Sequence, residues 1–226
     1  MRVLAIDTAT SCGVLGLAEN GRPVAELSLV SRETHSARLL PAIEWLLKTI
    51  GWTIAEIDGF GITLGPGSFT GLRVGLSTVK GFAWSLSKPV AALNSLEILT
   101  HQYREDRVTI VPMLDARRDR VFCAAYRWNG DRLVVLRPPS DSSAPEFVSA
   151  LEGPVVCFGE GARKYRGAIE AVGKDSVIFA PTEYDLPRGT TAARLASEAL
   201  SRGETLDIHR AEPIYLRPSE AERKRT

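Results

Sequence analysis

The chain has 226 residues, 44% of them hydrophobic and 24% charged, which is typical of a globular protein with one large domain or two small ones. The formal net charge of +1 gives no electrostatic signature of binding to nucleic acid or to an anionic membrane. The three cysteines lie far apart without metal-ligand spacing, and no stretch reads as a signal peptide or a membrane span, so we expect a cytoplasmic protein.

The first half of the chain predicts three strands followed by alternating helices and strands. Asn20-Gly21 indicates a tight hairpin, and apolar residues at helical spacing begin near Thr34. The expected elements are strands at 2–6, 13–18 and 23–30, a helix at 34–50, a strand at 60–64, a helix at 69–86, a strand at 90–93 and a helix at 94–103.

A glycine-rich turn, Gly65-Pro66-Gly67, connects the fourth strand to the second long helix. Such a turn exposes backbone N–H groups at a helix N-terminus, which suits a phosphate or a partner. It equally suits a tight connection without a ligand, and the local sequence favours this interpretation. The stretch fits neither a P-loop, since no Gly-Lys-Ser/Thr follows, nor a nucleophile elbow around Ser68.

The second half repeats the order of the first. Its expected elements are strands at 108–114, 121–127 and 133–136, a helix at 144–151, a strand at 155–158, a helix, a strand at 177–179 and a helix at 191–200. Asp115 ends a strand as Asp7 does, and a second Asn-Gly pair follows at Asn129. The sequence therefore predicts an α/β fold of two β-β-β-α-β-α lobes with mixed sheets, at 1–104 and 105–226.

This order of elements resembles actin, Hsp70 and the sugar kinases, which bind ATP between their halves. The resemblance implies an actin-like fold more firmly than it implies a ligand. Arg117 fits a solvated hairpin tip or a basic finger directed at a phosphate. A vestigial nucleotide cleft would be formed by Asp7, Thr8, Asp115, Arg117 and Gly159.

The stretch Gly65–Gly75, GPGSFTGLRVG, closely resembles the signature of the bacterial TsaB family, also called YeaZ. Ile6-Asp7-Thr8, His35-Ser36, Asp115-Ala116-Arg117-Arg118 and the run from Pro213 to Arg217 agree with it in the right order. The resemblance implies a partner on which the paralogue TsaD is assembled together with the ATPase TsaE. TsaD transfers threonylcarbamoyl to N6 of adenosine 37 in tRNAs that read codons beginning with A.

The catalytic paralogue carries an Asn-His-x-x-x-His metal motif, of which this chain keeps the asparagine alone. Asn94 is retained, but Ser95 and Leu99 stand at the two histidine positions. Neither side chain replaces imidazole as a metal ligand. The resemblance thus implies a non-catalytic scaffold without a metal or resident cofactor, with any nucleotide at or near the complex interface. An actin-like ATPase or phosphotransferase using Asp7 and Asp115, and a glycoprotease-like peptidase, are the alternatives.

The resemblance also implies a partner surface on the two long helices of the first lobe. It would bind TsaD in the cell and a second copy of the chain in isolation, with TsaE and TsaC as further partners and tRNA reached only through the complex. The first helix is apolar around more of its circumference than one sheet covers, and Gly71 and Gly75 would give a flat face. The expected interface residues are His35, Leu39, Ile43, Leu46, Gly71, Arg73, Gly75, Leu76 and Val79.

Overall fold

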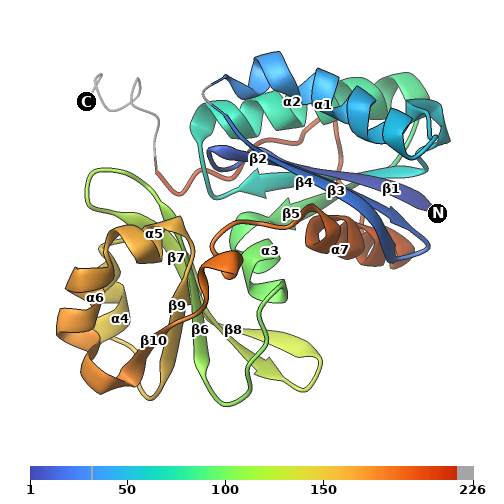
Figure 1. Cartoon of the computed structure of the whole chain (residues 1–226). Helices are drawn as coiled ribbons and strands as arrows, with labels where there is room; N and C mark the ends of the chain where they lie inside the picture. Colours follow the sequence, from blue (N-terminus) through green and yellow to red (C-terminus); the bar gives the residue numbers. More distant parts are fainter. Residues whose placement is uncertain (32, 218–226) are drawn as a thin grey trace. The chain divides into compact units, whose positions relative to one another are not determined.

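A computed structural model describes residues 1–31 and 33–217 of the chain, and divides it into two compact units (Figure 1). Unit 1 comprises Met1–Ile98 and Pro187–Ile214, and unit 2 comprises Leu99–Leu186 and residues 215–217 of the described chain. This division differs from two continuous lobes at 1–104 and 105–226. The chain returns to unit 1 after unit 2, and residues 218–226 of the expected second lobe lie outside the described part.

Unit 1 is built on a five-stranded mixed sheet in the order β3-β2-β1-β4-β5. β1 is antiparallel to β2 and parallel to β4, with Ile6 opposite Ile62. Asn20 and Gly21 form the expected hairpin with φ of 52° and 76°. The strands are β1 (Arg2–Asp7), β2 (Cys12–Glu19), β3 (Arg22–Val30), β4 (Gly59–Gly65) and β5 (Val90–Asn94).

Helices cover both faces of this sheet because residues alternate between its faces. Leu4 and Ile6 of β1 pack in one cluster with helices α1 (His35–Thr49) and α2 (Phe69–Leu86). Val3 and Ala5 pack in another with α7 (Gly189–Ser201), and Figure 1 shows α7 on the opposite face from α1 and α2. A short 3₁₀ turn, η1 (Ile54–Glu56), lies between α1 and β4 and carries a capping box of Thr53 and Glu56.

Helix α7 was expected to complete the second half, but it packs on the first sheet. Its packing is unusually close, because a Cβ at Gly16 of β2 would lie 1.7 Å from the carbonyl oxygen of Gly189. Ala192, Ala193 and Ala196 continue this small-residue face against the sheet. Small side chains on both elements let the backbones approach, which fixes α7 to unit 1.

Unit 2 repeats the sheet of unit 1, with strands in the order β10-β9-β6-β7-β8. β6 is antiparallel to β7 and parallel to β9, as β1 is to β2 and β4, so the predicted duplication is confirmed at the level of the sheets. The elements are α3 (Ser95–His101), β6 (Thr109–Asp115), β7 (Val121–Asn129), β8 (Arg132–Ser142), α4 (Ala144–Ser149), β9 (Val155–Phe158), α5 (Glu160–Lys164), α6 (Arg166–Gly173), η2 (Lys174–Ser176), β10 (Val177–Phe179) and η3 (Thr182–Tyr184). Of these, α3 links the two units, and α4, α5 and α6 pack with the second sheet.

Across residues 1–31 and 33–217, no helix combines the length and the apolar character needed to cross a membrane.

Candidate functional site

The glycine-rich turn before α2 packs against the loop that follows β1. The backbone N–H of Ser68 donates to the carbonyl oxygen of Ala9 at 2.6 Å, and a Cβ at Gly67 would lie 2.4 Å from that oxygen. The Ser95 hydroxyl donates to the carbonyl of Pro66 at 2.7 Å. Ser68 also caps α2 by accepting from the Gly71 N–H. The interpretation of this turn as a tight internal connection therefore fits the structure.

The two glycines of α2 continue this internal seam. A Cβ at Gly71 would lie 2.1 Å from the carbonyl oxygen of Thr8, and a Cβ at Gly75 would lie 2.3 Å from Thr8 Oγ1. Both glycines are buried. The expectation that they form a flat face for another subunit needs correction, because the close neighbour is the loop after β1 of the same unit.

Five of the expected interface residues also lie inside unit 1. They share a hydrophobic cluster with strands β1 and β4, and each is at most 5% exposed: Leu39, Ile43, Leu46, Leu76 and Val79. The helical periodicity correctly identified these residues as one apolar stripe. The stripe packs on the sheet of unit 1, whereas we had expected it to contact a partner. Of the nine residues, His35 is half-buried and Arg73 is exposed, while the other seven are buried.

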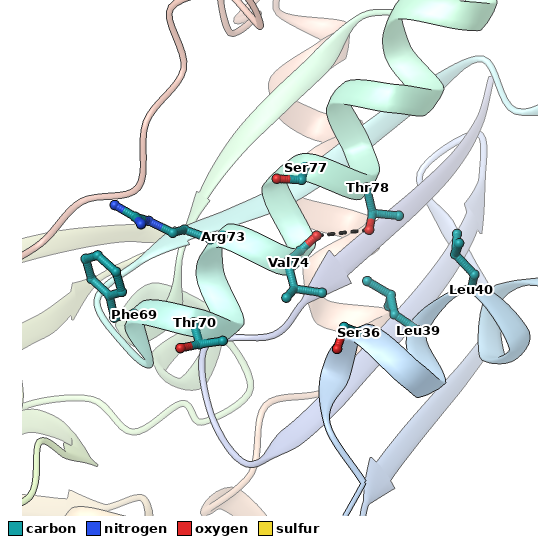
Figure 2. A pocket seen from close by; sticks show the side chains of 9 residues that line it. All are labelled: Ser36, Leu39, Leu40, Phe69, Thr70, Arg73, Val74, Ser77 and Thr78. Atoms are coloured by element: carbon teal, nitrogen blue, oxygen red, sulfur yellow. Dashed lines mark hydrogen bonds between the residues drawn. The ribbon is translucent and has the colours of Figure 1, made fainter.

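The outward surface of α1 and α2 contains a groove of ≈ 470 Å³ (Figure 2). Figure 2 shows Leu40 of α1 and Val74 and Thr78 of α2 beside it, with Arg73 at one edge. The guanidinium carbon of Arg73 lies 3.9 Å from the Phe69 ring centroid. The groove is lined by Ser36, Leu39, Leu40, Phe69, Thr70, Arg73, Val74, Ser77 and Thr78.

Three large apolar side chains of the two helices are exposed, and of these Leu40 lines the groove. Leu40 is 54% exposed, Trp45 of α1 is 57% exposed and Trp84 of α2 is 74% exposed. Neither Leu40 nor Trp84 was among the residues expected at the interface. Their signal was their position outside the stripe that faces the sheet, where an apolar residue has no role in the core.

His35 and Arg38 hold the start of α1 against the turn between β1 and β2. The Nε2 of His35 lies 2.8 Å from the Thr10 carbonyl oxygen, and Arg38 Nη2 donates to the Ser11 carbonyl at 2.8 Å. Arg38 Nη2 also lies 3.1 Å from His35 Nδ1, so this geometry requires a neutral ring with its proton on Nε2. Burial lowers the pKa of His35, and the charge of Arg38 lowers it further against the Thr10 hydrogen bond.

Asp7 and Thr8 of the predicted nucleotide cleft are both buried in unit 1. Asp7 Oδ1 accepts from the Ala9 N–H at 2.8 Å, and the Thr8 hydroxyl donates to the Gly71 carbonyl at 2.8 Å. Burial raises the pKa of Asp7 to about 6, and the Ala9 N–H and the neighbouring Thr63 hydroxyl oppose this shift. Asp7 Oδ2 and Thr63 Oγ1 have no partner in normal hydrogen-bond geometry among the described residues.

The other three residues of that cleft lie in unit 2. Asp115 accepts from the Arg117 N–H and from Lys164 Nζ, each at 2.9 Å. The Gly159 N–H donates to Asp185 Oδ1 at 2.8 Å. Arg117 is exposed in the turn between β6 and β7 with φ of 60°. Asp115 and Gly159 therefore use at least part of their hydrogen-bonding capacity within the unit.

The two positions that carry histidines in the catalytic motif are integrated into the fold. Ser95 is buried with its hydroxyl on Pro66, Leu99 is fully buried, and Asn94 Oδ1 accepts from the N–H groups of Leu96 and Glu97. In the part of the chain that the structure describes, no cluster of three or more His, Cys, Asp or Glu side chains could hold a metal ion.

Comparison with known proteins agrees with this architecture. Residues 29–224 match the family described as TsaD, tRNA N6-adenosine threonylcarbamoyltransferase. Two relatives are the tRNA threonylcarbamoyladenosine biosynthesis proteins TsaB of Bacillus subtilis and Escherichia coli. Each is 31% identical over 99% of this chain, and over 97% and 98% of its own length, respectively. The chain belongs to the TsaB family.

A solved structure, YeaZ from Pseudomonas aeruginosa, is similar to this TsaB-family chain throughout. It is 27% identical, with a TM-score of 0.81, over 95% of this chain and 99% of that chain. More distant structures share the fold alone, and together they confirm the duplicated actin-like architecture. Membership in the family places the chain in the biosynthesis of threonylcarbamoyladenosine in tRNA.

Proposed function

We propose that this TsaB-family chain is a non-catalytic scaffold subunit for the formation of threonylcarbamoyladenosine at position 37 of tRNA. The observation that carries the proposal is the replacement of the histidine pair by Ser95 and Leu99. One hydroxyl is bonded to a backbone carbonyl and the other side chain is fully buried. Ser95 Oγ would have to give up this hydrogen bond to bind a metal ion, and the Leu99 side chain has no atom that can coordinate one.

The proposed partner surface is the outward face of α1 and α2. Its groove and its exposed Leu40 and Trp84 offer apolar area that the sheet does not use. We assign this surface to TsaD in the cell and to a second copy of the chain in isolation. TsaE and TsaC are further partners, and tRNA is contacted through the assembled complex in the cytoplasm.

We further propose that this subunit has no resident cofactor and that any nucleotide binds at or near the interface with its partners. The predicted cleft residues support this view, because Thr8, Asp115 and Gly159 are hydrogen-bonded within their own units. The competing function, an autonomous ATPase or phosphotransferase, would need Asp7 or Asp115 as a base beside a bound nucleotide.

Copurification with TsaD and TsaE, followed by a tRNA modification assay, tests the proposal. The expected result is a complex that modifies tRNA only when this chain is present, while the pure chain modifies no tRNA and hydrolyses neither ATP nor peptides. ATP hydrolysis by the pure chain that Asp7→Ala abolishes would establish the ATPase. Peptide hydrolysis by the pure chain would establish the peptidase.

A further inference from the structure

The chain passes between the two units three times, and the third passage is anchored in both of them. After α7 the chain belongs to unit 1 as far as Ile214, and from Tyr215 it belongs to unit 2. Ala211 is 6% exposed and packs in the same cluster as α1 and α2, so the passage begins in the core of unit 1. We call residues 211–217 the C-terminal strap.

On the side of unit 1, the strap lies against the start of the glycine-rich turn. The N–H of Ile214 donates to the carbonyl oxygen of Leu64 in β4 at 2.7 Å. A Cβ at Gly65 would lie 2.6 Å from the carbonyl oxygen of Ile214, so the strap occupies the space that a side chain there would need. Both contacts are made by the backbone of Ile214, whose side chain is 49% exposed. The path of the strap and the conformation of Gly65 therefore depend on each other.

On the side of unit 2, Arg217 holds the end of the strap. Its Nε and Nη2 donate to the two carboxylate oxygens of Asp141 in β8, the second at 2.8 Å, and its Nη1 donates to the carbonyl oxygen of Ala116 at 3.2 Å. The side chains of Arg217 and Asp141 are only 14% and 13% exposed, so water and salt screen this pair less than a surface pair. A two-pronged bond of this kind also fixes the direction of the guanidinium group.

Arg120 binds the same carboxylate but is not part of the strap. Its Nε donates to Asp141 Oδ1 at 2.7 Å, directly before β7 begins at Val121. Removal of either arginine thus takes one guanidinium group from Asp141. Only the removal of Arg217 also releases the strap, and this difference supplies a matched control.

We propose that the strap couples the two units, so that the bond between Arg217 and Asp141 in unit 2 holds the glycine-rich turn of unit 1 in place. Only Tyr215 and Leu216 separate the two anchors, and so short a peptide with both ends bonded has few conformations left. When Arg217 lets go, the strap is held against Gly65 by its unit 1 contacts alone. The inference goes beyond the proposed function, because it concerns the isolated chain and needs no partner.

Amide hydrogen exchange of the isolated chain, followed by NMR, tests the proposal. The N–H groups of Ser68 and Gly71 report on the turn, since they bond to Ala9 and to the Ser68 hydroxyl within it. Arg217→Gln should speed their exchange by about tenfold through local opening, while the amides of β1 exchange as in the wild type. Arg120→Gln should leave the turn unchanged. Both variants should speed exchange in β8 near Asp141, which shows that each has disturbed the carboxylate.

Three results would overturn the coupling. The turn could keep its wild-type exchange in Arg217→Gln, or Arg120→Gln could loosen it as much, or the amides of β1 could speed up as much as those of the turn. The last result would mean that unit 1 unfolds as a whole. If Arg217→Gln does not fold, Arg217→Lys replaces it, because lysine keeps the charge but not the two-pronged bond, and an unchanged turn in that variant would also refute the proposal. Failure to bind TsaD would count against the proposed function and leave this inference as it stands.

Discussion

The hydroxyl group of Thr8 donates a hydrogen bond of 2.8 Å to the carbonyl oxygen of Gly71, and so ties the loop after β1 to the first turn of α2. One turn later along α2, the hydroxyl oxygen of Thr8 also occupies the space where a side chain at Gly75 would begin. The hydroxyl cannot move aside without losing this bond. Gly75 is therefore required by the core of unit 1, whatever partner the helix binds.

Two glycines of α2 should respond in opposite ways to alanine. Gly75→Ala should destabilise the protein by about 2 kcal/mol, because its Cβ would lie 2.3 Å from Thr8 Oγ1. Gly81 has no neighbouring atom within 4 Å of a built Cβ, so Gly81→Ala should stabilise it by about 1 kcal/mol through helix propensity. Urea denaturation of both variants measures the difference. Equal changes in the free energy of unfolding would mean that the loop containing Thr8 moves to accommodate the new Cβ at no cost.

Replacement of Asp7 by asparagine should make the protein more stable at neutral pH. The folded-state pKa of about 6 exceeds the usual value of 3.8, so the folded protein binds a proton more tightly than the unfolded chain. The stability cost is fully present above pH 6 and disappears as the pH falls from 6 towards 3.8. This corresponds to about 3 kcal/mol at pH 8.

The measurement is urea denaturation of wild type and Asp7→Asn between pH 4 and 8. The gap between them should close as the pH falls, and asparagine keeps the oxygen that accepts from Ala9. Asp131→Asn is the control, since that side chain is 96% exposed and should show no such pH dependence. A gap that is constant with pH would mean that Asp7 is not protonated in this range.

His35 should titrate below its usual pKa, and Arg38→Gln should raise that pKa. Burial is the main cause of the depressed pKa, and the guanidinium group of Arg38 adds to it. Stability linked to His35 is present above about pH 6.5 and falls as the pH drops towards the folded-state pKa. Titration of the imidazole resonance by NMR measures both proteins. A pKa unchanged by Arg38→Gln would remove Arg38 from the explanation.

Local signals in the sequence predicted most of the elements, because hairpin, cap and periodicity signals are short-range. α2 begins and ends at the predicted residues, and α3 begins at Ser95, next to the predicted start at 94. The placement of α7 was not predictable, because it depends on the contact between Gly16 and Gly189, which are far apart in the sequence. The repeated order of elements suggested two continuous lobes. In the structure, the chain instead returns to unit 1 after unit 2.

Most of the residues predicted for the interface lie on the side of α1 and α2 that faces the sheet of unit 1. Hydrophobic periodicity marks residues that leave water, and for Leu39 and Val79 the sheet of the same unit provides that burial. Gly75 has the same ambiguity, since a missing side chain permits close approach from inside or outside. Leu40 and Trp84 lie outside the apolar stripe of their helices, and the sheet that covers this stripe leaves both side chains exposed.

Asp185 should be necessary for the stability of unit 2. Its carboxylate accepts from the Gly159 N–H at 2.8 Å and from Arg163 Nε at 2.6 Å, and its side chain is 13% exposed. Removal leaves the largely buried guanidinium group of Arg163 without this partner, so Asp185→Ala should cost about 3 kcal/mol. Asp131→Ala breaks an exposed pair with Arg104 and should cost less than about 1 kcal/mol. Hydrogen exchange of β6 and β9 amides measures both, and equal protection in the two variants would contradict the role of Asp185.

A charge at Leu40 should weaken binding to TsaD without unfolding the chain. Leu40 is 54% exposed and lines the groove, so glutamate remains solvated in the free protein but loses water in the complex. We expect Leu40→Glu to weaken capture of TsaD by at least about tenfold, which corresponds to about 1.4 kcal/mol. Val135→Glu is the control, because Val135 is similarly exposed, at 50%, on β8 of unit 2.

Copurification and light scattering of these two variants measure assembly, and circular dichroism checks the fold. Both variants should keep the wild-type spectrum, because neither side chain belongs to a buried cluster. Loss of TsaD binding in Leu40→Glu alone would place the interface on α1 and α2. Equal loss in Val135→Glu, or wild-type binding by a folded Leu40→Glu, would place the interface elsewhere on the chain.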